Sequence, residues 1–246
     1  MSSAPARAAE PVTIEGRFNG PKTTANGGYA CGTLARFIPG PAEVTLRVPP
    51  PLDHPLDVVY VEDGAELRDG ETLVASARPI GPLGFEPPVR PTVDEALDAQ
   101  TRHPWIGVRT PLSDCFVCGY GREGGLGLCF GPLAERPEIN GAVLRPRPDI
   151  PARDGAVASE ILWAALDCPS YTPDVSAGPM ALLGRLSAEL LRSVGSDETL
   201  VAVGWPLAAE GRKHHTASAL LDSGGGTVAL ARALWIEVRG APVVAS

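Results

Sequence analysis

Apolar residues follow two patterns along the chain: short runs in which every second position is apolar, and two longer segments that are apolar almost throughout. Alternation at a period of two is typical of half-buried β-strands. In the first half it predicts strands around Val12–Phe18 and in the runs 43–48, 56–61 and 72–77. In the second half it predicts strands in the runs 126–130, 186–194, 200–205 and 227–238.

The two longer apolar segments predict helices that are buried on most sides. Residues 25–37 and 155–167 carry small or apolar side chains nearly all round, and Pro39 and Pro169 follow them closely. A helix without a polar face must lie inside a protein, and the position before a proline disfavours helical geometry. A curved antiparallel sheet wrapped around each helix would supply such an environment.

The same pattern occurs twice, which indicates an internal duplication. Residues 65–80 resemble residues 218–236, and residues 25–37 resemble residues 153–167. Each half reads as a strand, a helix and then a run of antiparallel strands. Repeats of this size usually correspond to whole domains that pack against each other, because a single short unit cannot bury its own apolar face.

Turn-forming and disordered segments divide the chain into four parts. Residues 1–10 resemble a disordered tail, residues 11–80 form the first unit, residues 81–125 form a connector and residues 126–246 form the second unit. The connector is rich in proline and glycine, and its residues 92–95 have the pattern of a helix-starting capping box.

A hairpin turn is predicted at Asp69-Gly70, between the runs 56–61 and 72–77. An insertion in the second copy is predicted around residues 206–215, and residues 211–215 within it are predicted as a solvated loop at the end of a long hairpin.

Composition narrows the possible partners. The 246 residues are 44% hydrophobic and 20% charged, with a formal net charge of −8. Nucleic-acid affinity depends on clustered Lys and Arg, and no long basic run is present, so no nucleic-acid partner is predicted. No apolar stretch approaches the roughly 20 residues that cross a bilayer, so no membrane partner is predicted. Five scattered cysteines and the absence of a secretory-signal pattern favour a reducing cytoplasm.

These residues resemble the hotdog superfamily. The resemblance lies in the Asn-Gly-Gly-Tyr helix start at residues 26–29 and in the strand and hairpin pattern, and the duplication is similar to double-hotdog acyl-CoA thioesterases of the thioesterase-II-like group. It implies an α+β fold, a tandem hotdog in which each curved antiparallel sheet wraps around a central buried helix. It also implies a site near the junction of the two units and an acyl-CoA or similar thioester as substrate. A duplicated chain could be a monomer that acts as a pseudo-dimer, or a homodimer.

Three glycines are candidates for binding the thioester. Helix N-termini present unpaired N–H donors and a partial positive charge, and such donors stabilise the oxyanion that forms when a thioester is attacked. Gly27 and Gly28 stand at the start of the first helix, and Gly155 stands at the start predicted for the second. The alternative is that these glycines only form the turn into each helix.

Two acids on the second helix are candidates for catalysis. Glu160 and Asp167 fall on one helix face, and a buried acid with a shifted pKa suits a general base. The resemblance implies that Asp167 is the catalytic acid, with Ser187 on the next strand and a later Gln orienting the water. The chain departs from that pattern because its only glutamine is Gln100. In the alternative interpretation, Glu160 pairs with an arginine and Asp167 makes a local turn at the helix end.

The remaining polar groups give weaker signals. Cys115, Cys118 and Cys129 provide only one close pair, whereas structural zinc normally needs two, so buried thiols in a tight turn are favoured and no metal is predicted. No segment has the context of a dinucleotide fingerprint, and no cofactor is predicted. Arg212 and Lys213 belong to the densest cationic stretch and could bind the phosphates of CoA, although a solvated loop is the simpler reading.

The sequence favours hydrolysis of an acyl-CoA thioester by acid-activated water at the junction of two hotdog units. The main alternative is a hotdog protein that binds an acyl group, CoA or another small ligand without catalysis. A hotdog hydratase is less favoured because its Asp-x-Asn-Pro motif is absent. A purely structural or partner-binding module is the third alternative.

Overall fold

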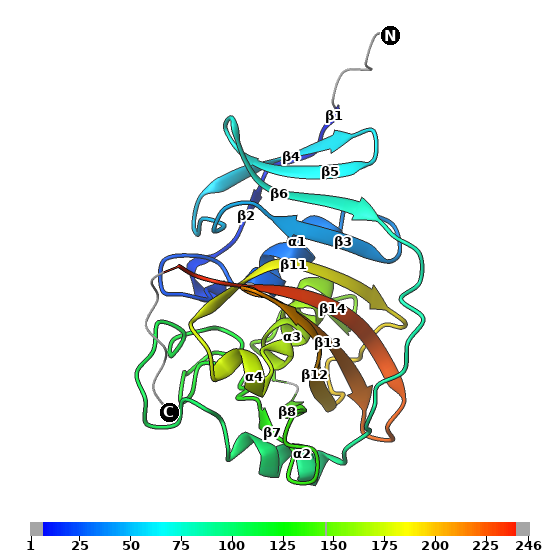
Figure 1. Cartoon of the computed structure of the whole chain (residues 1–246). Coiled ribbons are helices and arrows are strands. Elements are labelled where there is room, and N and C mark those ends of the chain that lie inside the picture. The colour runs from blue at the N-terminus through cyan, green and yellow to red at the C-terminus, as the bar shows by residue number, and fades with distance from the viewer. Residues whose placement is uncertain (1–6, 146, 240–246) are drawn as a thin grey trace.

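The computed structural model describes residues 7–145 and 147–239, and within them a single antiparallel sheet of twelve strands curves around two helices (Figure 1). The strands of the first half are β1 (Arg7–Ala8), β2 (Val12–Thr13), β3 (Ala42–Leu46), β4 (Pro55–Val61), β5 (Gly64–Asp69) and β6 (Thr72–Pro79). Those of the second half are β7 (Gly131–Pro132), β8 (Asn140–Leu144), β11 (Ala181–Leu190), β12 (Leu200–Glu210), β13 (Lys213–Asp222) and β14 (Thr227–Glu237). A separate small hairpin joins β9 (Ala152–Arg153) to β10 (Ala156–Val157).

The two halves share one topology. In the first half the order across the sheet is β2-β4-β5-β6-β3, and in the second half it is β8-β12-β13-β14-β11. If the five strands of each order are numbered along the sequence, the first pairs with the third and the fifth pairs with the second in both halves. A helix lies between the first and second strands each time. Strands β3 and β11 pair at the middle, with Val44 opposite Leu186, and they make the two halves one continuous sheet.

The predicted fold class is confirmed in these elements, and several predicted boundaries are wrong. Residues 126–130 form no strand, and the first long strand of the second half is β8. β13 begins at Lys213, inside the segment predicted as a loop. β5 is a strand of its own, so the hairpin closed near Gly70 joins β5 to β6. Arg7–Ala8, predicted within a disordered tail, pair with β4, and residues 1–6 lie outside the described residues. The division of the chain at residue 126 stays a prediction.

The two central helices are α1 (Gly27–Ala35) and α3 (Ser159–Asp167), and both are buried along almost their whole length. They run antiparallel in direct contact, because the start of α1 meets the end of α3. A Cβ atom placed on Gly28 would lie 2.7 Å from the Trp163 carbonyl oxygen, and one on Gly32 would lie 2.6 Å from the Cα of Glu160. Only glycine permits this approach, since a side chain at either position would overlap the backbone of α3.

The connector packs against the sheet as an ordered segment. Its helix α2 (Val93–Gln100) has the predicted capping box, in which Thr92 and Glu95 bond each other's backbone N–H groups. Ala96 and Ala99 of α2 are fully buried in a second, smaller apolar cluster with residues of β8, β12 and β13. The stretch after α2 contributes to the main core through Trp105 and Phe116. The connector therefore forms part of the interior.

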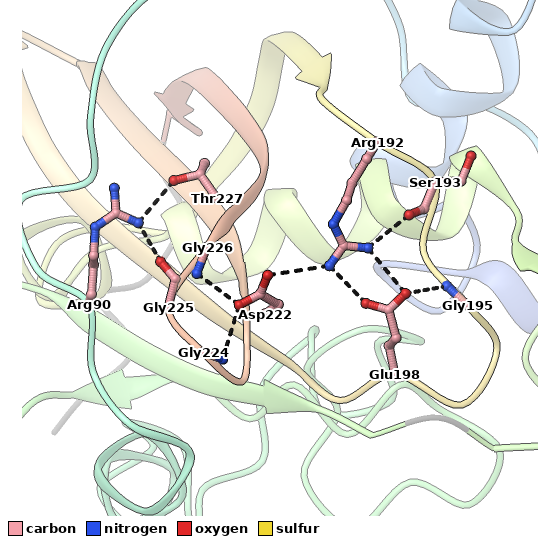
Figure 2. Close-up of polar contacts among 10 residues, drawn as sticks. All are labelled: Arg90, Arg192, Ser193, Gly195, Glu198, Asp222, Gly224, Gly225, Gly226 and Thr227. Atoms are coloured by element: carbon pink, nitrogen blue, oxygen red, sulfur yellow. Dashed lines mark hydrogen bonds and ion pairs between the residues drawn. The ribbon is translucent and has the colours of Figure 1, made fainter.

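Polar contacts fix the connector to the far end of the second half (Figure 2). The guanidinium of Arg90 donates to the hydroxyl of Thr227 at 3.0 Å, at the turn between β13 and β14. Within that turn, the Asp222 carboxylate accepts from the N–H groups of Gly224 and Gly226. The Asp222 carboxylate also contacts the guanidinium of Arg192 at 3.5 Å, and Arg192 in turn pairs with Glu198 at 2.8 Å. These contacts tie the β13–β14 turn to the connector.

Among the described residues, no helix combines the length and the apolar character that crossing a membrane requires. The remaining short helix, α4 (Pro173–Ser176), follows a 3-10 turn at Cys168–Ser170.

Candidate active site at the α1–α3 junction

A cavity of about 330 Å³ opens where the start of α1 meets the end of α3. Its walls come from both halves and from the connector, and most of its side chains are apolar. They include Leu46, Trp105, Phe130, Tyr171, Leu183 and Trp235. An apolar cavity with a few polar groups at one end is the usual form of a small-molecule site.

Asp167 is the buried acid of this cavity, whose other acidic residue, Glu237, is partly exposed. Asp167 is the last residue of α3, and only 2% of its surface is exposed. Its Oδ2 accepts a hydrogen bond from the Gly28 N–H at 2.8 Å and another from the Asn26 side-chain amide at 3.0 Å. Its Oδ1 is buried and has no partner among the described residues. Burial raises the pKa of Asp167 to about 7, and the two hydrogen bonds partly oppose that rise.

The start of α1 supplies the donors of the site. The Asn26 side chain caps the helix by accepting from the Tyr29 N–H at 2.8 Å, and its amide nitrogen reaches across to Asp167. The Gly28 N–H is engaged by Asp167. The Gly27 N–H makes no hydrogen bond within the described residues, and Gly27 lines the cavity. Of the two predicted glycines, Gly27 therefore presents the available donor, and Gly28 positions the acid.

Gly155 does not stand at the start of the second helix, as the sequence predicted. Helix α3 begins at Ser159, and Gly155 lies in the tight turn between β9 and β10 with a φ of +78°. Its left-handed backbone explains why a glycine stands there, since other residues rarely adopt that conformation. Gly155 does not line the cavity.

Glu160 lies at the opposite end of the α1–α3 contact from Asp167, where it is paired with two arginines. Its carboxylate is bound by Arg153 at 2.6 Å and by Arg36, at the end of α1, at 3.2 Å. Burial raises the pKa of Glu160, but the hydrogen bond from Arg153 and the charge of Arg36 outweigh it, so that the pKa lies below its usual value. Glu160 does not line the cavity. This is the arginine pairing that the sequence left open as the alternative to catalysis.

Replacing Arg153 by alanine is expected to lower the free energy of unfolding by about 2 kcal/mol, because Glu160 then stays buried with one partner. The figure is below that of a fully buried pair since the Arg153 side chain is 55% exposed. Urea unfolding measures it. Adding Glu160→Gln to Arg153→Ala should recover part of the loss. Arg147→Ala is the matched control, because it breaks an exposed pair with Asp149 and should cost less than about 0.5 kcal/mol. Equal losses of stability in Arg153→Ala and Arg147→Ala would contradict a stabilising ion pair between Arg153 and Glu160.

Ser187 is not the partner of Asp167. Its hydroxyl donates to Glu43 on the neighbouring strand β3 at 3.1 Å, and the residue does not line the cavity. The single glutamine is also elsewhere, because Gln100 bonds the backbone of Val143 and Gly127. The polar partner that the structure brings to Asp167 is Asn26. Its position directly before Gly27-Gly28 was the signal in the sequence, since asparagine is a preferred helix N-cap.

A cluster of three buried thiols lies in the same cavity wall. The sulfurs of Cys115, Cys118 and Cys168 all lie within 4.8 Å of one another. Hydrogen bonds from the other two thiols hold the pKa of Cys115 well below its usual value, and the backbone N–H groups of Cys118 and Val117 add to this effect. The third thiol is Cys168, next to Asp167, whereas the sequence had grouped Cys129 with the pair.

The basic residues Arg212 and Lys213 do not line the cavity, but each contacts or pairs with a residue that does. Arg212 stands in the turn between β12 and β13, and its guanidinium donates to the backbone oxygen of Glu237 at 2.7 Å. Lys213 is exposed and pairs with Ile236 across the sheet. Both Ile236 and Glu237 line the cavity. Their placement suits a charged group of a ligand whose apolar part lies inside.

The sequence matches no family model and no curated protein. Three solved structures share its fold over most of their length. A protein of Novosphingobium aromaticivorans, provisionally named a thioesterase, is 14% identical with a TM-score of 0.61, and the match covers 93% of this chain and 94% of that one. A hot dog fold protein of unknown function from Alicyclobacillus acidocaldarius is 11% identical, with a TM-score of 0.55 and coverage of 96% and 97%. The tesB protein of Mycobacterium avium subsp. paratuberculosis is 12% identical, with a TM-score of 0.55 and coverage of 88% for both chains.

The chain therefore has the hotdog fold, as the shared topology of its two halves also indicates. These neighbours match it across both halves within one chain, and two of the matching structures are provisionally named thioesterases.

Proposed function

We propose that the chain hydrolyses acyl-CoA thioesters, with Asp167 activating the attacking water. The observation that supports this most strongly is that one apolar cavity is lined both by Asp167, whose Oδ1 has no partner among the described residues, and by Gly27, whose N–H makes no hydrogen bond there. A carboxylate oxygen without a donor can accept a proton from water. A free amide at a helix N-terminus can polarise a carbonyl oxygen.

In this proposal the reaction uses water, the Asp167 carboxylate and the backbone N–H at the start of α1. Asp167 takes a proton from water as the water oxygen bonds the thioester carbon. The carbonyl oxygen becomes an oxyanion, which the Gly27 N–H and the positive end of α1 stabilise more than they stabilise the substrate. The intermediate then collapses, the carbon–sulfur bond breaks, and Asp167 returns the proton to the CoA thiolate. The products are the free acid and CoA.

The shape of the cavity suits an apolar acyl group. Trp105, Phe130 and Leu183 are among the apolar residues that line it. In this proposal the CoA moiety extends toward the rim, where Arg212 and Lys213 bind its phosphates as charged donors. All five cysteines are free thiols, and a cytoplasmic location is part of the proposal because reduced thiols persist in that compartment.

Replacing Arg212 by alanine is expected to raise KM for an acyl-CoA about fivefold and to leave kcat unchanged, because an exposed charge contact is worth about 1 kcal/mol. Higher salt should shrink the difference. The same acyl group on N-acetylcysteamine, which has no phosphates, should show no change in KM. Arg136→Ala, at an exposed pair with Glu138, is the control. An equal rise with both thioesters would contradict a phosphate contact.

The direct test is release of free thiol from a panel of acyl-CoAs, with chains from acetyl to palmitoyl and one aryl example, followed with a thiol reagent. Turnover of at least one member above the rate without protein is expected. If none turns over, hydrolysis is wrong.

A non-catalytic acyl or CoA binder is the second candidate. The engagement of the Gly28 N–H by Asp167 favours it, because one of the two amides at the helix start is then unavailable to a ligand. Calorimetric titration with CoA and with a non-hydrolysable acyl-CoA thioether separates the two. Binding without turnover on the panel would support the non-catalytic binder. If the chain shows neither binding nor turnover, both candidate functions are wrong.

A further inference from the structure

Three thiols from distant parts of the sequence meet in the cavity wall. Cys115 and Cys118 come from the connector, and Cys168 comes directly after α3. The sulfurs of Cys115 and Cys168 are 3.9 Å apart, and all three lie within 4.8 Å of one another. Sulfurs that share one tetrahedral zinc ion lie about 3.8 Å apart, since each zinc–sulfur bond is about 2.3 Å long. We propose that Cys115, Cys118 and Cys168 bind one zinc ion through their thiolates.

The turn that carries the first two thiols is rigid. The Gly119 N–H donates to the Cys115 carbonyl at 2.9 Å, and the Leu128 N–H donates to the Val117 carbonyl at 2.9 Å. A Cβ atom on Gly119 would lie 2.5 Å from the Cys115 carbonyl oxygen, so the turn requires glycine there. Two sulfurs held by a fixed turn lose little freedom when they bind a metal, because their geometry already exists before binding.

Polar groups around the cluster suit ligated sulfur. The side-chain amide nitrogen of Asn26 lies 3.9 Å from the Cys115 sulfur and 3.8 Å from the Cys168 sulfur, within hydrogen-bond range for sulfur. Groups of this kind orient metal ligands and reduce the charge that each sulfur carries. Zinc replaces the proton on each thiol, the protons pass to solvent, and the oxidation state of sulfur and metal stays the same.

The fourth zinc ligand would come from the cavity. Among the described residues, the group of metal-binding side chains within reach contains these three cysteines alone. All three also line the cavity. Zinc sites with three protein ligands keep a fourth position for water or another small molecule, whereas purely structural sites fill it from the protein. The geometry therefore points to a zinc ion whose open position faces the cavity.

The test uses the full-length chain, reduced and stripped with a chelator, and titrated with Co²⁺ under nitrogen. Cobalt reports its ligands through sulfur-to-metal charge-transfer absorption and tetrahedral d–d bands. One equivalent of Co²⁺ per chain with both signals is expected, and one equivalent of Zn²⁺ should remove them. X-ray absorption on the zinc form should give three sulfur neighbours at about 2.3 Å. The binding measurement does not depend on thioester hydrolysis.

The decisive variant is Cys168→Ser, with Cys129→Ser as the matched control because Cys129 is outside the cluster. Cys168→Ser should weaken Zn²⁺ binding by more than about 100-fold, since even groups behind the ligands change affinity 10–100-fold. Cys129→Ser should bind as the wild type does. Circular dichroism checks that both fold. If Cys168→Ser does not fold, the sulfur count in the wild-type zinc form decides.

Three results would overturn the proposal. The first is a reduced chain that takes up neither Co²⁺ nor Zn²⁺. The second is cobalt absorption without charge transfer from sulfur, or a zinc form with fewer than three sulfur neighbours. The third is equal binding by Cys168→Ser and Cys129→Ser.

Discussion

Replacement of Asp167 by asparagine is expected to lower kcat/KM for the best acyl-CoA by at least about 100-fold, because general-base catalysis contributes about 10²–10⁴ to a rate. Asparagine has nearly the same shape, and its side-chain oxygen can still accept from the Gly28 N–H and from Asn26. It cannot take a proton from water. The variant also removes a buried charge, so its melting temperature is not expected to fall. Steady-state kinetics and thermal unfolding measure the two effects.

The control is Glu160→Gln, which removes a buried carboxylate from the same helix. Glu160 lies at the other end of the α1–α3 contact and is bound by Arg153 and Arg36. We expect this variant to lose stability. Its kcat should stay within about threefold of the wild type, because Glu160 does not line the cavity in which the reaction is proposed to take place. An Asp167→Asn enzyme with more than a tenth of wild-type activity would show that another group activates the water.

The strand and helix pattern of the sequence predicted most of the fold because burial sets that pattern directly. Both central helices were found from their lack of a polar face, and the capping box of α2 from two residues, Thr92 and Glu95. The start of α3 was misplaced because Gly155 was read as a helix start. The sequence does not reveal that its φ is +78°, which belongs to a turn.

Strands with continuous apolar runs were harder to find than alternating ones. The buried strand β8 has all five of its residues buried, so alternation cannot reveal it. The run 126–130 does alternate, but it packs as irregular chain in the main core. Periodicity reports which residues are buried, whereas strand pairing depends on neighbours that lie far away in the sequence.

The candidate site was predicted only in part, for the same reason. Asp167 and Gly28 were each singled out, but their contact joins residues 139 positions apart. Cys168 joins Cys115 across 53 positions. The first pair follows from how closely α1 and α3 approach, and the second from how the connector packs at the end of α3. The glycines that permit the helix approach are also common in ordinary turns. Ser187 was assigned from the resemblance alone, whereas in the structure its hydroxyl bonds Glu43 on the neighbouring strand β3.

One helix contact therefore sets both stability and the proposed chemistry. At one end of it Glu160 is held by two arginines, and at the other Asp167 is held by the start of α1. The distance between the helices fixes where the Asp167 carboxylate lies relative to the Gly27 N–H. A change that separates the helices is expected to disturb the site even if no catalytic atom is altered.

Replacement of Gly28 by alanine is expected to push helices α1 and α3 apart. The new Cβ would lie 2.4 Å from the Cβ of Asp167 and 2.7 Å from the Trp163 carbonyl oxygen. Alanine favours a helix over glycine by about 1 kcal/mol, but overpacking in a core costs about 1–3 kcal/mol and more where backbone must move. Because backbone atoms of α3 form part of this contact, we expect a net loss of at least about 2 kcal/mol in the free energy of unfolding, measured in urea. Activity on acyl-CoA should fall with it, because the Asp167 carboxylate moves.

Gly81→Ala is the matched control for that loss. No atom lies within 4 Å of the Cβ it would add, and its φ is not in the left-handed region. Its effect on stability should stay within about 0.5 kcal/mol, as is usual at open surface positions. Gly32→Ala, whose Cβ would lie 2.6 Å from the Cα of Glu160, should destabilise the chain about as much as Gly28→Ala. Its effect on kcat should be smaller, since it acts at the end of the helix contact that is distant from Asp167. A Gly28→Ala chain as stable and as active as Gly81→Ala would mean that α1 and α3 are not in close contact, and the placement of Asp167 would then be wrong.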